Sequence, residues 1–237
     1  MALIETIPVT GSTNADLAAR LRGGERIGEG QWLVAERQTQ GRGRQGRDWF
    51  EGAGNFMGST IVRLQPGDPV LTGLPFLAGL AVYEAVAGML AQPQLLQLKW
   101  PNDLMLSGAK LAGILLERVE DAVIVGIGVN LAQAPQLPGR KTAALSNLGP
   151  APEAGAFALR LADSFAEELR HWREYGMQAL LTRWLAAAHP DGTPLTVHEQ
   201  GAAMISGTFA GLEESGALRL RLADGATRVI HAGDVFV

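Results

Sequence analysis

The sequence feature that most constrains the fold is an abrupt change at residues 189–192, which read His-Pro-Asp-Gly. The residue before a proline disfavours helix, and an Asp-Gly pair turns the chain. Five short strand-like segments follow within residues 195–237, some of them separated by glycine-containing turns. Closely spaced short strands are typical of a small β-barrel or sandwich. We therefore expect two domains, a larger one over residues 1–190 and a small β-barrel over residues 191–237.

The larger part combines strand-like and helical segments. Apolar and β-branched runs predict strands at residues 2–7, 32–36, 56–64, 95–100, 104–106, 111–118 and 122–129. Apolar spacing, caps and breakers predict helices at residues 15–21, 74–90, 157–172 and 177–188. Long loops are expected at residues 37–54 and 131–152. The larger part is therefore expected to combine a sheet with helices.

The composition excludes several classes of protein. The chain has no cysteine, which rules out a disulfide scaffold, a thiolate metal site and a thiol nucleophile. It is 47% hydrophobic, too apolar for a disordered chain, and its net charge of −4 argues against a general nucleic-acid binder. The most apolar stretch, residues 70–90, contains Glu84, which a bilayer span would avoid. Because the N-terminus shows no basic and apolar leader, we expect a cytoplasmic protein with no membrane partner.

Residues 38–49 carry the densest motif, QTQGRGRQGRDW, with three glycines and three arginines between Gly41 and Arg47. Glycine lets a backbone approach a ligand closely, and arginine matches carboxylate or phosphate oxygens, so the loop suits an anionic ligand. The spacing also matches the dinucleotide fingerprint, but no helix is predicted to open here, and arginines do not suit a pyrophosphate turn. A solvated flexible loop and an RNA-contacting segment are the alternatives.

A second motif is the segment 99–104, KWPNDL, in which proline and asparagine predict a rigid turn at a strand end. Such a turn can present Asp103 as a metal-binding or general-base carboxylate and Asn102 as a hydrogen-bonding group. An ordinary turn without a functional role is the simpler alternative.

Two further motifs place glycines where a ligand needs room. Lys110 enters an apolar strand and Gly113 follows three residues later, which suits a cation held over a ligand. An edge-strand lysine and a bulge glycine are the alternative. Gly126 and Gly128 lie on one face of a predicted strand, because side chains alternate. Because these glycines have no side chains, that face leaves room either for a flat ligand or for packing against another backbone.

Several known catalytic devices do not occur in the sequence. It contains no P-loop, nucleophile elbow or kinase catalytic loop, so ATP would need another kind of site. The four histidines have no ligand spacing to one another, and we predict no metal site built from side chains. The segment 12–14, Ser-Thr-Asn, is by itself an ordinary helix cap.

Taken in order, the segments 12–14, 38–47, 99–104, 110–115 and 126–130 resemble those of the biotin protein ligases, which activate biotin with ATP and attach it to a carrier-protein lysine. Five such strings in this order are specific, and the C-terminal β segments also fit the family. The resemblance implies a short form without an N-terminal DNA-binding domain. We expect an α+β catalytic domain similar to class II synthetases, with a mixed, mostly antiparallel sheet backed by helices, and a C-terminal SH3-like β-barrel.

The resemblance also implies a role for each matching residue. Biotin is expected to bind through Ser12, Thr13, Asn14, Gln38, Gly41, Arg42, Gly43, Arg44, Lys110, Gly113, Gly126 and Gly128. ATP and the adenylate are expected to bind through Arg47, Trp49, Asn102, Asp103 and Asn130. The expected catalytic residues are Lys110, Arg42, Arg44 and Asp103. Mg²⁺ would arrive with ATP near Asp103, which would also help to deprotonate the acceptor lysine. Gln45 stands where the family commonly has an arginine.

The partners are implied by the same resemblance. The acceptor is expected to be a lysine of a biotin carboxyl carrier protein, and binding to operator DNA is not expected. Dimerisation through the catalytic sheet stays open. A lipoate ligase or acyl transferase of the same architecture is the nearest alternative function, and an RNA-binding module is the alternative from another class.

Overall fold

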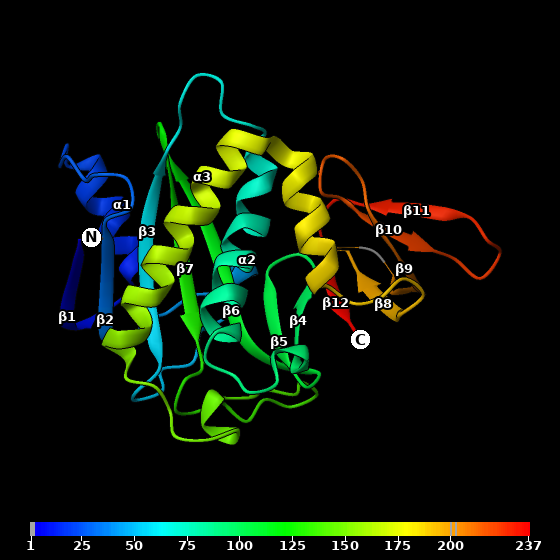
Figure 1. The fold of residues 1–237 in the computed structure, drawn as a ribbon, viewed down its shortest axis with the longest axis horizontal. Coiled ribbons are helices and arrows are strands. Elements are labelled where there is room, and N and C mark those ends of the chain that lie inside the picture. Colours follow the sequence, from blue (N-terminus) through cyan, green and yellow to red (C-terminus); the bar gives the residue numbers. More distant parts are fainter. Residues whose placement is uncertain (1–2, 200, 202) are drawn as a thin grey trace.

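The computed structural model of this chain describes residues 3–199, 201 and 203–237 (Figure 1). The larger part contains β1 (Ile4–Thr10), α1 (Thr13–Arg22), β2 (Trp32–Gln38), β3 (Phe56–Arg63), α2 (Leu74–Ala87), β4 (Leu96–Lys99), β5 (Asp103–Leu106), β6 (Ala109–Val119), β7 (Ala122–Val129) and α3 (Ala154–Ala187). The C-terminal part contains β8 (Pro194–His198), β9 (Ile205–Leu212), β10 (Leu218–Arg221), β11 (Thr227–Ile230) and β12 (Asp234–Phe236). Short 3₁₀ segments are η1 (Arg44–Gly46), η2 (Leu71–Gly73), η3 (Pro93–Leu95) and η4 (Leu145–Asn147).

Seven of the described strands form one sheet, in the order β1-β2-β3-β7-β6-β5-β4. β1 and β2 pair in parallel, and the other neighbouring strands of this sheet pair antiparallel. The expected mixed, mostly antiparallel sheet is therefore confirmed. The register places Asp103 opposite both Lys99 and Gly113, and Gly113 opposite Gly128. Motifs that are far apart in the sequence thus meet on adjacent strands.

The sheet buries apolar side chains on both faces. Successive side chains of a strand point to opposite faces, so Trp32 joins the core beneath α2 and α3 while Leu33 joins a second core beneath α1. Figure 1 shows α2 and α3 lying side by side across one face of the sheet. In α1, Leu17 and Leu21 pack against Ile61 and Ile124 of the central strands. The helices therefore back the sheet as expected, and α1 covers the face opposite to α2 and α3.

The C-terminal strands form a separate antiparallel sheet in the order β11-β10-β9-β8-β12, and this confirms the expected SH3-like β-barrel. It packs against the larger part through specific hydrogen bonds. The Trp100 indole N–H donates to the carbonyl of Gly216 over 3.0 Å, and Lys99 Nζ donates to the carbonyl of Val235 over 3.0 Å. Within the described residues, no helix has the length and apolar character that crossing a membrane requires.

The structure differs from the sequence-based expectations in a few places. The two helices expected at 157–172 and 177–188 both fall on α3, which begins earlier, at Ala154, and is interrupted by a kink at Gly176, whose φ of 76° and ψ of −172° are not helical. The strand expected at 2–7 continues to Thr10, while residue 2 lies outside the described residues. Asp103, expected in a turn, is the first residue of β5 because it pairs with Lys99 across the hairpin.

Candidate functional site

A cavity of about 560 Å³ opens on the face of the sheet that carries α1. Its position follows from the glycines of β7. Ile124 packs beneath α1, and the next residues on the same face, Gly126 and Gly128, have no side chain and line the cavity. The volume lies in the range of pockets that hold small-molecule ligands. The cavity is the candidate functional site.

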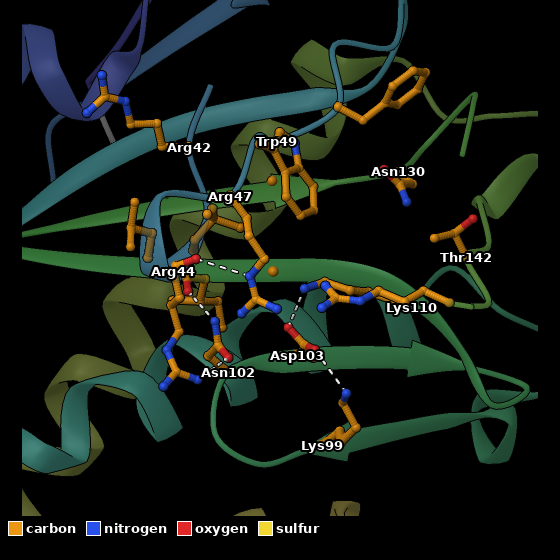
Figure 2. A pocket seen from close by; sticks show the side chains of 18 of the residues that line it. Arg42, Arg44, Arg47, Trp49, Lys99, Asn102, Asp103, Lys110, Asn130 and Thr142 are labelled. Atoms are coloured by element: carbon orange, nitrogen blue, oxygen red, sulfur yellow. Dashed lines mark hydrogen bonds and ion pairs between the residues drawn. The ribbon is translucent and has the colours of Figure 1, made fainter. Parts of the chain in front are cut away.

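Asp103 lines this cavity and lies between two lysines, Lys110 and Lys99, as Figure 2 shows. Its carboxylate is 2.6 Å from Lys110 Nζ and 3.2 Å from Lys99 Nζ, and its side chain is only 12% exposed. Burial opposes ionisation, but the charges and hydrogen bonds of Lys110 and Lys99 outweigh it, so the pKa of Asp103 is lowered. The carboxylate is therefore ionised at neutral pH, and it holds two ammonium groups at one place.

The lowered pKa of Asp103 predicts a pH dependence of stability. A carboxyl group whose folded pKa lies below its unfolded value of about 3.9 stabilises the fold above that pH. The stabilisation is lost as the pH falls through the folded pKa. Asp103→Asn is therefore expected to lower the free energy of unfolding by about 3 kcal/mol at pH 7, because it leaves two lysines without their partner. Urea unfolding of both proteins from pH 7 to pH 3 should show this difference shrinking below about pH 4. A difference that stays constant over this range would contradict the assignment.

Trp49 and Asn130 form one side of the cavity, near Lys110 (Figure 2). The indole ring lies flat against β7, because a Cβ on Gly128 would be only 2.2 Å from it, and Lys110 Nζ is 5.7 Å from its centroid. Asn130 is 2% exposed and donates from Nδ2 to the carbonyl of Ala143 over 3.1 Å. Among the described residues, neither the indole N–H of Trp49 nor Oδ1 of Asn130 has a hydrogen-bond partner. This side therefore contains one buried donor and one buried acceptor that have no partner in the described part of the chain.

The arginine-glycine loop covers the other side of the cavity. Two of its arginines, Arg44 and Arg47, hold it in place through hydrogen bonds. Arg44 Nη1 donates to Asn102 Oδ1 over 3.2 Å. Arg47 pairs with Asp234 of β12 through two hydrogen bonds of 2.8 and 3.2 Å. Burial lowers the pKa of Arg44, but a guanidinium stays charged in proteins. The Arg42 side chain is exposed and forms no ion pair within the described part of the chain. The loop is thus fastened to the larger part and to the C-terminal sheet.

A chain of buried polar groups forms the end of the cavity beneath the start of α1. The backbone N–H of Thr13 donates to Gln38 Oε1 over 2.7 Å, and Thr13 Oγ1 lies 2.6 Å from Ser59 Oγ. Ser59 Oγ donates to Asn14 Oδ1 over 2.6 Å, and Asn14 Nδ2 donates to Glu117 Oε2 over 2.6 Å. Four of these side chains, those of Thr13, Asn14, Gln38 and Ser59, are buried, so their directions are fixed by one another.

The structure brings together almost every residue that the sequence singled out. The cavity is lined by Ser12, Thr13, Asn14, Gln38, Arg42, Gly43, Arg44, Arg47, Trp49, Asn102, Asp103, Lys110, Gly113, Gly126, Gly128 and Asn130. Gly41 is not among the lining residues. It lies behind the wall, where a Cβ would come within 3.1 Å of Gln38 Nε2 and 3.3 Å of Trp49.

The room expected over the strand glycines is filled by the protein itself. A Cβ on Gly113 would lie 2.9 Å from the Trp49 ring, and one on Gly126 would lie 2.2 Å from Asn14 Oδ1. The glycines therefore admit the Trp49 ring and the Asn14 amide, and a ligand would share the space above them.

Several lining residues were missed by the sequence interpretation. Ser59 lies opposite Gly126 on β3, and only the strand pairing reveals it. Lys99 belongs to the KWPNDL motif. Its spacing of four residues from Asp103 across a hairpin turn could have predicted their ion pair. Asp234 and Phe236 come from the C-terminal sheet, and no local pattern relates them to the loop that they approach.

The residues present do not fit a magnesium ion held by the protein alone. Asp103 already binds two lysines, and Asp234 already binds Arg47. In the part of the chain that the structure describes, no three histidine or carboxylate side chains converge on one point. Mg²⁺ usually keeps oxygen ligands from phosphates and water beside one or two carboxylates. We therefore assign no catalytic step to a protein-bound ion.

Comparison with known proteins gives consistent results. Residues 7–131 match the model of the biotin/lipoate A/B protein ligase family, and residues 196–237 match that of the biotin protein ligase C terminal domain. The chain is 40% identical to the biotin–[acetyl-CoA-carboxylase] ligase of Paracoccus denitrificans, over 96% of this chain and 97% of that protein. It is 37% identical to the enzyme of the same name from Mycobacterium tuberculosis, over 98% of this chain and 88% of that protein.

The fold is also similar to that of a solved structure. The biotin protein ligase of Aquifex aeolicus in complex with biotin and ATP superimposes with a TM-score of 0.85 and 27% sequence identity. The alignment covers 100% of this chain and 98% of that one. The similarity therefore includes both sheets.

Proposed function

The chain belongs to the biotin/lipoate A/B protein ligase family, and we propose that it activates biotin with ATP and transfers the biotinyl group to a lysine of a biotin carboxyl carrier protein. The observation that carries the proposal is the convergence of Lys110, Lys99 and Asp103 beside Trp49 and Asn130 in one cavity. A cationic centre next to a flat aromatic surface suits a reaction between a carboxylate and a nucleotide.

In the first step, a carboxylate oxygen of biotin attacks the α-phosphorus of ATP. The bond from that phosphorus to the bridging oxygen breaks, and pyrophosphate leaves with the electron pair. Two anions must meet, so negative charge has to be offset where the new bond forms. Lys110 and Arg44 are two of the cations that line the cavity, and Asp103 fixes the position of Lys110. Arg42 would join them only after its exposed side chain turns inward.

The adenine base is proposed to bind beside Trp49 and Asn130. Oδ1 of Asn130 is buried and has no partner among the described residues, while Nδ2 is held by the carbonyl of Ala143. The amide therefore cannot turn without losing that bond, and it presents an acceptor. The exocyclic amino group of adenine is a donor of matching chemistry.

This assignment predicts discrimination between ATP and inosine triphosphate, which has a carbonyl in place of the amino group. The wild-type enzyme is expected to prefer ATP by at least about tenfold in kcat/KM, because a carbonyl would face the Asn130 oxygen. In Asn130→Ala, the preference should fall close to one. The ratio within one variant does not depend on the fraction of folded enzyme. Equal preference in wild type and variant would contradict the role of Asn130.

In the second step, the amine of the acceptor lysine attacks the carbonyl carbon of biotinyl-5'-AMP. An amide forms, AMP leaves, and the amine loses a proton. The arginine-glycine loop, fastened by Arg44 and Arg47, shields the mixed anhydride from water until the acceptor arrives. The geometry does not favour Asp103 as the base for the amine, since a carboxylate with a lowered pKa that binds two lysines is a weak proton acceptor. We assign Asp103 to positioning Lys110 and Lys99.

Several wider features belong to the same proposal. Magnesium would enter with the phosphates of ATP, the acceptor would be the biotin carboxyl carrier protein, and the enzyme would act in the cytoplasm. The division into residues 1–190 and 191–237 is supported by the separate family matches and by the separate C-terminal sheet. The expected lack of binding to operator DNA stays a prediction from the sequence, and dimerisation stays open.

Transfer to the acceptor is tested directly by mass spectrometry. The purified enzyme, Mg-ATP and biotin are mixed with an isolated biotin carboxyl carrier domain, and with the same domain in which the acceptor lysine is replaced by arginine. We expect the mass of one biotinyl group to be added to the first domain and none to the second. Modification with lipoate in place of biotin would support the lipoate ligase alternative. Addition to neither domain would contradict the transferase part of the proposal.

A further inference from the structure

The lysines of this chain are confined to one place. Its 20 Lys+Arg residues include three lysines, Lys99, Lys110 and Lys141, and all three line the cavity. The other residues of this set are arginines, whose guanidinium group stays protonated and is not a nucleophile. The side-chain amines are therefore gathered where the proposed function forms an acyl-adenylate, which is an electrophile that amines attack.

Two of these three amines are held by Asp103. Its carboxylate is 2.6 Å from Lys110 Nζ and 3.2 Å from Lys99 Nζ, and Lys99 Nζ also donates to the carbonyl of Val235 over 3.0 Å. An ionised carboxylate at these distances binds the ammonium form, which has no lone pair with which to attack a carbonyl carbon. Lys99 and Lys110 are therefore poor acceptors of an acyl group, although they lie in the cavity.

Lys141 differs from the other two lysines in its surroundings. Its side chain is exposed, and within the described part of the chain it forms no ion pair. The sequence offers it no local partner either, because residues 122–152 contain no aspartate or glutamate. Lys141 is thus the lysine whose amine no described carboxylate holds.

The backbone fixes Lys141 beside the cationic centre. The backbone N–H of Lys110 donates to the carbonyl of Lys141 over 2.9 Å, and the N–H of Ala143 donates to the carbonyl of Lys110 over 2.9 Å. Thr142, the residue between them, pairs with Lys110 and lies near it in Figure 2. Thr142 Oγ1 also donates to the carbonyl of Pro135, which closes the loop. The Lys141 side chain therefore starts from a fixed point at the wall of the cavity.

We propose that Lys141 is an internal acceptor, which takes the biotinyl group when no carrier protein is present. The inference rests on the proposed function, because that function supplies biotinyl-5'-AMP. The neutral amine of Lys141 attacks the carbonyl carbon of the adenylate, and a carbon–nitrogen bond forms. The bond from that carbon to the phosphate oxygen breaks, AMP leaves with the electron pair, and the amine proton passes to the solvent. The product is an enzyme with a biotinyl amide at Lys141.

The test is peptide mass spectrometry of the full chain after incubation with Mg-ATP and biotin and without a carrier. Labelling is normalised to the biotinyl-5'-AMP present, which is measured by chromatography in the same samples. We expect the mass of one biotinyl group on the peptide that contains Lys141, and at least about tenfold less on Lys99 and Lys110 because their ammonium groups are ion-paired. Lys141→Arg keeps the charge and removes the amine, so biotinyl label on the lysines should fall by about tenfold or more.

Arg160→Lys separates reaction in the cavity from reaction with released adenylate. Arg160 is exposed on α3, and α3 covers the face of the sheet opposite to the cavity. The lysine introduced there meets only adenylate that has left the enzyme. Two groups held side by side react at effective concentrations far above that of a dilute enzyme, so Lys141 should carry at least about tenfold more label than the introduced lysine. An excess of free lysine in the buffer should suppress labelling of the introduced lysine and not that of Lys141.

The outcomes separate this inference from the proposed function. If biotinyl-5'-AMP forms and Lys141 carries no label, the inference is overturned and the activation reaction stands. Equal labelling of Lys141 and of the lysine introduced by Arg160→Lys would also overturn it, because released adenylate would then explain the modification. If neither adenylate nor label forms, the proposed function is overturned together with the inference.

Discussion

Replacing Lys110 with alanine is expected to slow the formation of biotinyl-5'-AMP by about 10²- to 10³-fold, with little change in the fold. The ammonium group of Lys110 is 2.6 Å from Asp103, lies in the cavity and is 5.7 Å from the centroid of Trp49. It is therefore placed between the proposed adenine surface and the anionic reaction centre. Its loss removes a fixed positive charge where two anions must meet. Asp103 keeps Lys99 as a partner, so the buried carboxylate is not left uncompensated.

The measurement is the single-turnover rate of adenylate formation at saturating biotin and ATP. Arg118→Ala serves as the matched control, because it removes one positive charge from the same strand at an exposed position, where the side chain donates to the carbonyl of Glu120. Thermal unfolding of Lys110→Ala checks that the variant is folded. A folded Lys110→Ala enzyme that forms the adenylate at the wild-type rate would show that Lys110 has another role.

Replacing Arg44 with glycine is expected to release the adenylate into solution about 10- to 100-fold faster than wild type. Arg44 connects the arginine-glycine loop to Asn102 across the cavity, and a hydrogen bond from a charged donor contributes about 1.5–3 kcal/mol. Each 1.4 kcal/mol corresponds to about a factor of ten in a rate or equilibrium. A glycine at this place also makes the loop more flexible, which adds to the effect. Free biotinyl-5'-AMP is measured by chromatography after rapid removal of the enzyme.

Gln45 provides the control for loop flexibility. It is exposed, follows Arg44 directly and has a positive φ of 57°, which glycine adopts without strain. Gln45→Gly therefore adds flexibility to the same loop without removing the contact to Asn102, and the release rate should stay near that of wild type. Equal release from both variants would attribute the effect to the backbone, and release no faster than wild type from Arg44→Gly would refute the shielding role of the loop.

Much of the fold could be predicted because its signals are local. The β-branched run at 122–129 forms β7 with the predicted bounds, and the Pro-Asp-Gly segment at 190–192 does separate α3 from β8. The break at Gly176 was also predicted, because the helical patterns at residues 157–172 and 177–188 lie on either side of this glycine.

The site was predicted where the chemistry lies within one string and missed where it depends on tertiary pairing. Lys110 and Asp103 were identified from their own segments, and the register of β5 and β6 then places them in contact. The pair of Arg47 and Asp234 joins the arginine-glycine loop to the C-terminal sheet, and no local pattern connects the two residues. The directions of the Asn130 and Asn14 amides depend on partners such as the carbonyl of Ala143, which belong to other segments. The sequence therefore indicates which residue types line the cavity. Which of their atoms donate and which accept hydrogen bonds depends on contacts that the fold creates.

The central claim is that the cavity joins biotin to the α-phosphate of ATP. It is tested most directly by the exchange of labelled pyrophosphate into ATP, measured with biotin, with lipoate and with neither acid. We expect exchange with biotin alone and none without an added acid. Exchange with lipoate alone would keep the architecture and the cationic centre but change the substrate. The absence of exchange with both acids, by a folded enzyme that binds ATP, would contradict the proposed activation reaction.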